Sequence, residues 1–159
     1  MAVADKDILY RVAYDEAVRA LVEQQAEIES FRTRAGLLFS STAITTSFLG
    51  AQSFGLGDMS LASWMALIAF MGVAIASLAV LWPHSWEFSV NPRDALGPYL
   101  RGEEPVPVHR LHRELSLHMH SSYIENRAGI FQLAVLLQTA SALLTLEVIF
   151  WIISIATAT

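Results

Sequence analysis

The chain has 159 residues, of which 54% are hydrophobic, and a formal net charge of −5. The negative charge excludes an electrostatic attraction to nucleic acid polymers, and the lack of cysteine excludes disulfides, thiol catalysis and cysteine-ligated metals. The hydrophobic fraction exceeds the ~45–50% of ordinary soluble domains. It is concentrated in three blocks, so the composition predicts one small all-α membrane protein with three transmembrane helices.

Residues 1–35 predict a cytoplasmic amphipathic helix. The segment has no glycine or proline, is rich in good helix formers, and lacks the apolar core of a cleavable signal peptide. Alanine dominates its least polar stripe, which favours packing against another helix of the same protein over the alternative of lying flat on lipid. The stripe consists of Leu9, Ala13, Ala17, Ala20, Leu21, Gln24, Ile28, Phe31 and Ala35.

Residues 36–82 predict a transmembrane hairpin. The apolar runs Gly36–Phe54 and Leu61–Trp82 flank the polar break GLGDMS, and Asp58 is the only charged residue between Arg34 and Pro83. Each run has roughly the 20 residues that cross ~30 Å of hydrocarbon. Small residues recur along the second run at helical spacing, so we expect a neighbouring helix to approach it closely. They are Ala62, Ala66, Ala69, Gly72, Ala76 and Ala79.

The first apolar run is rich in hydroxyl groups. On a helix Ser41, Thr45 and Gln52 share one face, whereas Thr42 and Thr46 share another. Such side chains bond back to carbonyls of their own helix or bridge to a neighbouring helix. The alternative is a polar face that lines a water path after oligomerisation.

Residues 83–128 predict a cytoplasmic loop and helix, and residues 129–156 predict the third transmembrane helix. The stretch from Pro83 to Pro107 contains all five prolines, and its segment WEFSV alternates as a short strand would. From Val108 a helical pattern continues to the end, so the first and third spans both extend into the cytoplasm as long helices. One face of this pattern carries Leu111, Leu115, Met119, Ser122 and Asn126.

The positive charges predict the topology. All ten Lys and Arg lie before the first apolar run or between the second and the third. By the positive-inside rule, the N-terminus is cytoplasmic and the C-terminus is outside. Arg34-Ala35-Gly36 enters the first span and Arg127-Ala128-Gly129 enters the third, which gives both arginines equivalent places in parallel helices.

Glu147 is the only ionisable residue inside a predicted span. Intramembrane acids are rare and commonly functional. Counting along parallel helices places Glu147 near Ser47, Gly50 and Gln52, and we take Glu147, Ser47 and Gln52 as a polar site in the membrane. The acid either holds the helix bundle together or takes part in ion conduction or switching.

A second candidate site is basic and lies in the cytoplasmic segments. Arginines close to aromatic side chains suit a small anion that carries a base, such as a nucleotide. The alternative is that these arginines pair with nearby glutamates. The ligand-binding candidates are Arg32, Arg110, Arg113, Arg127, Tyr99 and Tyr123.

Catalytic and metal-binding patterns are missing from the sequence. His109 and His112 share a helical face, but no zinc signature, nucleophile elbow, glycine-rich phosphate loop or paired-carboxylate motif occurs. The sequence therefore predicts a non-enzymatic protein without cofactor or metal.

The arrangement resembles small bacterial membrane effectors of cyclic-nucleotide antiphage defence, namely Pycsar-type transmembrane effectors and the broader SLATT-like group. The resemblance is carried by EIESFRTRAGLLFSSTAITTSFLG, by the return through LWPHSWEF, and by the re-entry at YIENRAG. Three spans depart from the simpler two-span members. The resemblance implies a cytoplasmic region that senses a nucleotide signal, and spans that oligomerise and damage the inner membrane.

We therefore expect a multi-pass protein of the bacterial inner membrane that contacts the lipid bilayer, forms a homo-oligomer and responds to a cytoplasmic signal such as a cyclic nucleotide. Binding would change helix packing and impair the membrane barrier. The alternative is a structural membrane subunit or scaffold whose cytoplasmic helices dock a partner protein.

Overall fold

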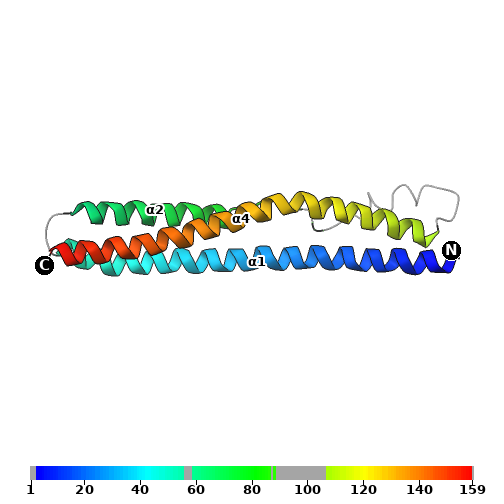
Figure 1. Cartoon of the computed structure of the whole chain (residues 1–159), viewed down its shortest axis with the longest axis horizontal. Coiled ribbons are helices and arrows are strands. Elements are labelled where there is room, and N and C mark those ends of the chain that lie inside the picture. Colours follow the sequence, from blue (N-terminus) through cyan, green and yellow to red (C-terminus); the bar gives the residue numbers. More distant parts are fainter. Residues whose placement is uncertain (1–2, 56–58, 87, 89–106, 159) are drawn as a thin grey trace. The chain divides into compact units, whose positions relative to one another are not determined.

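The computed structural model describes residues 3–55, 59–86, 88 and 107–158. Its helices are α1 (Val3–Gly55), α2 (Leu61–Leu81) and α4 (Val108–Ala158), shown in Figure 1. The described part of the chain has no strand, which confirms the all-α class. Of the predicted strand WEFSV only Trp86 and Phe88 are described, and most of the loop to Pro107 lies outside the described residues.

The helices contribute to two compact units. Unit 1 comprises Met1–Ile28 and His84–Ile130, and unit 2 comprises Glu29–Pro83 and Phe131–Thr159. Helices α1 and α4 are unbroken over 53 and 51 residues, so each contributes residues to both units. The prediction that the flanking segments and the apolar runs form single long helices is therefore confirmed.

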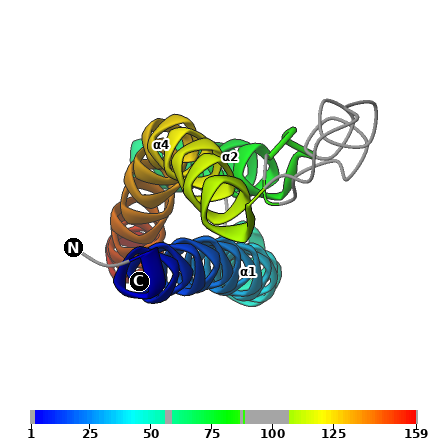
Figure 2. The ribbon, with the colours of Figure 1, turned by 90° about the vertical axis from the view of Figure 1, so that its right-hand side faces the viewer.

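Unit 2 contains three helices that lie side by side (Figures 1 and 2). Residue pairs Gly50–Trp151 and Ser53–Ser154 rise together along α1 and α4, so these helices are parallel. Helix α2 runs the opposite way, because Ser63 meets Ser154 whereas Gly72, further along α2, meets Leu143, which lies earlier in α4. Ser60 caps its N-terminus by accepting a hydrogen bond from the Ser63 amide.

The small residues of α2 permit the expected close approach. Ala66, Ala69 and Ala76 are buried, and a Cβ added to Gly72 would lie 2.7 Å from Leu143 Cδ1 of α4. Val73, Ala76 and Ala140 form the apolar core of this unit. Close packing of this kind favours helix association inside or outside a membrane.

Unit 1 pairs the first part of α1 with the first part of α4. Gln24 Nε2 donates a hydrogen bond of 3.0 Å to the Tyr123 carbonyl, and Leu21 and Ile28 are buried. The predicted stripe is thus confirmed in its second half. It is wrong at its start, because Leu9 is 56% exposed and Tyr10 instead stacks on His109.

A seven-residue spacing describes the buried positions better than the predicted stripes do. On α1 the series is Leu21, Ile28, Ala35 and Thr42, all buried. On α4 the series is Asn126, Leu133, Ala140, Glu147 and Ser154, again all buried. A seven-residue repeat is the signature of helices that wind around each other in a left-handed sense.

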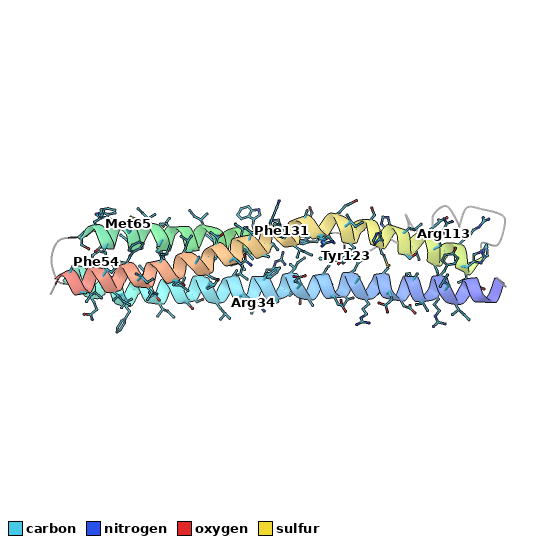
Figure 3. All side chains as sticks on the ribbon, in the orientation of Figure 1. Arg34, Phe54, Met65, Arg113, Tyr123 and Phe131 are labelled. Carbon is cyan, nitrogen blue, oxygen red and sulfur yellow. The ribbon has the colours of Figure 1, made fainter. Side chains whose placement is uncertain are left out.

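Two of the described helices, α2 and α4, are long and apolar enough to cross a membrane. Most of the side chains in their apolar stretches are not buried, and Met65 of α2 and Phe131 of α4 are exposed on the outer sides of their helices (Figure 3). The run from Gly36 to Phe54 in α1 does not meet the same criterion. Its many hydroxyl groups and Gln52 lower its mean hydropathy.

Candidate functional site

The carboxylate of Glu147 is fully buried between α4 and α1 in unit 2. Thr42 Oγ1 donates a hydrogen bond to Glu147 Oε2, and Thr46 Oγ1 donates one of 2.5 Å to Oε1. The two threonines are one helical turn apart, so each reaches one oxygen of the same carboxylate. A buried acid needs such partners, because an unpaired one costs several kcal/mol.

The register between α1 and α4 decides which residues meet Glu147. Thr46 and Glu147 are 101 positions apart in the sequence, and so are Ser53 and Ser154. This register places Arg34 beside Leu137 and Gln138, with which it lines one groove. The prediction that Arg34 and Arg127 hold equivalent places is therefore wrong, since a spacing of 101 positions puts Arg34 level with Val135, eight residues or ~12 Å further along α4 than Arg127.

Two of the residues that the sequence assigns to the membrane polar site do not contact the acid. Ser47 is exposed and its hydroxyl donates to the Ala43 carbonyl of the same helix at 2.7 Å. Gln52 is exposed as well. The structure brings Glu147 together with the Thr42 and Thr46 face, which sequence reasoning recognised as a face but did not assign to the acid.

A cluster of four serines lies at the end of unit 2 that contains the start of α2. Ser53 of α1, Ser63 of α2 and Ser154 of α4 are buried, and their hydroxyl oxygens are 2.7–3.1 Å apart. Ser60 joins them at 3.0 Å from Ser154. Because each helix supplies at least one hydroxyl, the cluster links all three helices.

Two further polar atoms are buried in the same unit. Ser77 Oγ and Trp151 Nε1 have no hydrogen-bond partner within the described part of the chain. Trp151 is fully buried and packs on Gly50 and Phe54. Together with Glu147 and the serines, these groups make the interior of unit 2 unusually polar.

The described basic candidates of unit 1 are spread along α4. Arg110, Arg113 and Arg127 are all exposed on α4. Arg110 and Arg113 are one turn apart, but Arg127 lies a further fourteen residues, or ~20 Å, along the helix from Arg113. Arg32 is half-buried and belongs to unit 2, and Tyr99 lies outside the described residues.

The first part of unit 1 contains two aromatic stacks that sequence reasoning missed. Tyr14 stacks on His112 with ring centroids 5.4 Å apart, and Tyr10 stacks on His109 at 6.4 Å. His109 Nδ1 also lies 3.1 Å from Asp7 Oδ1. The sequence contains a signal for these stacks: the two tyrosines are four residues apart and the two histidines are three residues apart, so each pair shares one face of its helix.

Metal ligation finds no support among the described residues, where no group of three or more histidine, cysteine, aspartate and glutamate side chains could hold an ion. Comparison of the chain with protein families, curated proteins and solved structures found no match. Fold and site therefore define the class only coarsely, as an all-α chain with two helices able to cross a membrane and a buried acid in one of them.

Proposed function

We propose that the protein is a non-enzymatic membrane effector of the bacterial inner membrane, inserted by three spans. The first span would be residues 36–54 of α1, although this run is less apolar than the other two. Ser40 and Ser47 donate hydrogen bonds to carbonyls four residues back in their own helix, which reduces their cost in hydrocarbon. Ile44 and Phe48 are 69% and 70% exposed and would face lipid.

The proposed orientation places the N-terminus and the 83–128 segment in the cytoplasm and the C-terminus outside. It rests on the positive-inside rule, since all Lys and Arg precede residue 35 or lie between residues 83 and 128. A reporter fused to the C-terminus that is active only in the cytoplasm should be silent. A fully active reporter there would contradict the orientation.

The observation that carries the effector function is the buried hydrogen bonding of Glu147 by Thr42 and Thr46. An acid in a span is expensive and is retained where it acts on ions, protons or helix assembly. In the resting protein Thr42 and Thr46 donate hydrogen bonds to the Glu147 carboxylate. A change in the packing of α1 on α4 would move the threonines away from Glu147. Its carboxylate would then need hydrogen-bond donors from water or from another copy of the chain.

The proposed signal is a small anionic ligand such as a cyclic nucleotide, bound by the cytoplasmic segments. Arg110 and Arg113 are exposed on the turns of α4 that also carry His109 and His112, whose rings are stacked on α1. An anion bound there would act on the contact between the helices. Because α1 and α4 are unbroken, a change in their pairing there can alter the pairing further along.

The test is dye release from liposomes that contain the purified protein, with and without 3′,5′-cyclic nucleotides. Release and assembly into oligomers should appear only with the active nucleotide. Glu147→Gln should abolish release but not assembly, whereas Glu16→Gln, which changes an exposed acid, should leave release intact. The absence of both release and ligand-induced assembly would contradict the proposal.

A second candidate function is a membrane scaffold that docks a partner protein. Its support is an exposed apolar patch on α1 in unit 1, where Ile8, Leu9 and Val12 are 65%, 56% and 54% exposed. Exposed apolar groups in a polar segment commonly mark an interaction surface. A stoichiometric partner in a gentle-detergent pulldown, lost in Ile8→Ser/Val12→Ser, would favour this function over the effector.

A further inference from the structure

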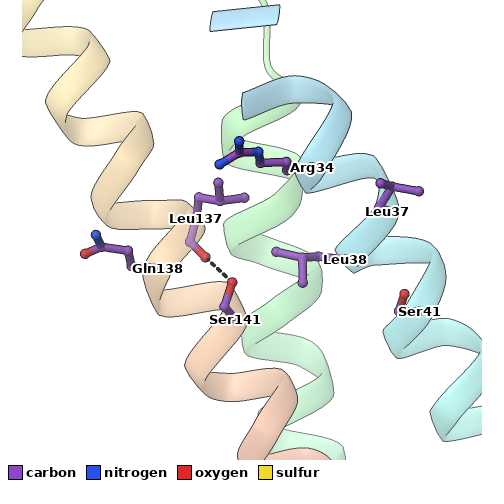
Figure 4. Close-up of a pocket in the computed structure, with 7 residues that line it drawn as sticks. All are labelled: Arg34, Leu37, Leu38, Ser41, Leu137, Gln138 and Ser141. Atoms are coloured by element: carbon purple, nitrogen blue, oxygen red, sulfur yellow. Dashed lines mark hydrogen bonds between the residues drawn. The ribbon is translucent and has the colours of Figure 1, made fainter. Parts of the chain in front are cut away.

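A groove between α1 and α4 in unit 2 has an arginine at one end and is lined mainly by leucines along the rest of its length. Its volume is about 570 Å³, and every residue that lines it belongs to one of these two helices (Figure 4). Arg34 reaches from α1 toward α4 at one end. The remaining lining residues are Leu37, Leu38, Ser41, Leu137, Gln138 and Ser141.

The hydroxyls in the groove add little polarity. Ser141 Oγ donates to the Leu137 carbonyl of its own helix at 2.9 Å, which leaves the leucines as the main surface. Arg34 is exposed, and no acidic side chain within the described residues forms an ion pair with it. The groove therefore offers one uncompensated positive charge above an apolar channel.

The helix pairing within unit 2 gives the level of Arg34. Ser53 of α1 meets Ser63 of the antiparallel α2. Counting equal numbers of residues from this pair reaches Arg34 on α1 and Trp82 on α2. The distance from the serine cluster is about 30 Å at ~1.5 Å per residue, which is the thickness of the hydrocarbon layer.

Arg34 and Trp82 are the residue types that occupy a membrane interface. Trp82 is 69% exposed at the end of α2, as an interfacial tryptophan would be. With Arg34 at this level, the leucines of the groove lie at the depth of the acyl chains. Basic pockets between spanning helices on the cytoplasmic side are suited to anionic lipid headgroups.

We propose that this groove binds an anionic phospholipid, with its phosphate on Arg34 and an acyl chain along Leu37, Leu38 and Leu137. A second copy of the chain is the alternative occupant, and the experiment below distinguishes it from a lipid. The lipid site rests only on the membrane placement of the proposed function and requires neither leakage nor a nucleotide signal.

The experiment compares lipid binding by native mass spectrometry of the full chain released from a mild detergent. Phosphatidylglycerol and phosphatidylcholine with identical acyl chains are added to wild type, Arg34→Gln and the control Arg11→Gln. Arg11 is an exposed arginine of α1 outside the groove. Wild type and the control should prefer the anionic lipid by about fivefold or more, since one arginine near the headgroups contributes ~1 kcal/mol.

Arg34→Gln should remove this preference, and Ser141→Phe, which fills the groove, should weaken binding of both lipids. Glycerol 3-phosphate has the anion without the acyl chain and should not compete at millimolar concentration. Equal binding of the two lipids by wild type, an unchanged preference in Arg34→Gln, or full competition by glycerol 3-phosphate would overturn the proposal. So would a Ser141→Phe variant that loses oligomers but binds lipid as before, because a second copy would then occupy the groove.

Failure of this inference is distinguishable from failure of the proposed function. A protein that leaves the membrane fraction in high salt without detergent would contradict the membrane placement itself. A protein that needs detergent and prefers the anionic lipid but never leaks dye would retain the lipid site and lose the effector function.

Discussion

Thr42 of α1 donates a hydrogen bond to Glu147 of α4, and both side chains are fully buried. The pair joins two long helices at a point where neither the threonine nor the acid can reach solvent. Its energetic role can be measured directly. The following predictions test this contact and three others in the described part of the chain.

Thr42→Val should destabilise the protein by about 1–3 kcal/mol, because it leaves one oxygen of a buried carboxylate without its donor. The measurement is unfolding in detergent, followed by loss of the helical circular dichroism signal. Thr139→Val is the matched control, since this exposed hydroxyl donates to the Val135 carbonyl of its own helix, and its effect should stay within about 0.5 kcal/mol. Equal effects of the two substitutions would show that the Glu147 contact has no special role.

Gly72→Val should destabilise the helix bundle by about 1–3 kcal/mol through overpacking against Leu143. The added Cβ would lie 2.7 Å from Leu143 Cδ1, and a branched side chain would need still more space. Leu143→Ala should partly restore stability in the double variant. By contrast, Gly36→Ala meets nothing within 4 Å in the interior of α1 and should stabilise by about 0.5–1 kcal/mol. A destabilised Gly36→Ala would contradict the continuous helix at that position.

Trp151→Ala should destabilise by about 3–5 kcal/mol, because it empties a fully buried site beside Gly50 and Phe54. Trp64→Ala removes the same side chain from a position that is 54% exposed and should cost much less. The same unfolding experiment compares the two variants. Similar losses would mean that Trp151 is not the buried tryptophan of the bundle.

Gln24→Leu should stabilise unit 1 by about 1 kcal/mol, since a polar side chain at a buried seam position fixes register at a cost in stability. Gln24 donates to the Tyr123 carbonyl, but its Oε1 has no partner among the described residues. Hydrogen exchange of amides around residues 17–28 should slow in this variant. Gln25→Leu changes an exposed neighbour and should have a smaller effect. Faster exchange in Gln24→Leu would show that the hydrogen bond outweighs apolar packing.

Much of the helical architecture could be predicted because its causes are local. The absence of proline and the supply of good helix formers predict α1, and the apolar run from Leu61 agrees with α2 to within one residue. Pro83 follows Trp82, the C-cap of α2, as a helix-terminating residue would. The small residues of α2 were correctly predicted to permit close packing, because the lack of side-chain volume at Gly72 is a property of the residue itself.

The partners of Glu147 could not be predicted, because periodicity fixes a face and leaves the axial shift between two helices undetermined. A displacement of seven residues, or ~10 Å, superimposes the buried series of α1 on itself and changes which residue meets the acid. The shared RAG segments suggested one register. Packing of Gly50 on Trp151 and the bonds among Ser53, Ser63 and Ser154 select another.

The sequence by itself determined that this chain is helical, where its apolar helices begin and end, and that an acid lies within one of them. Only the tertiary structure decided that Thr42 and Thr46, rather than Ser47 and Gln52, bind that acid, and that Arg34 stands at the head of an apolar groove. The physical reason is that helix formation depends on residues four apart, whereas register depends on how side chains from distant segments fit together.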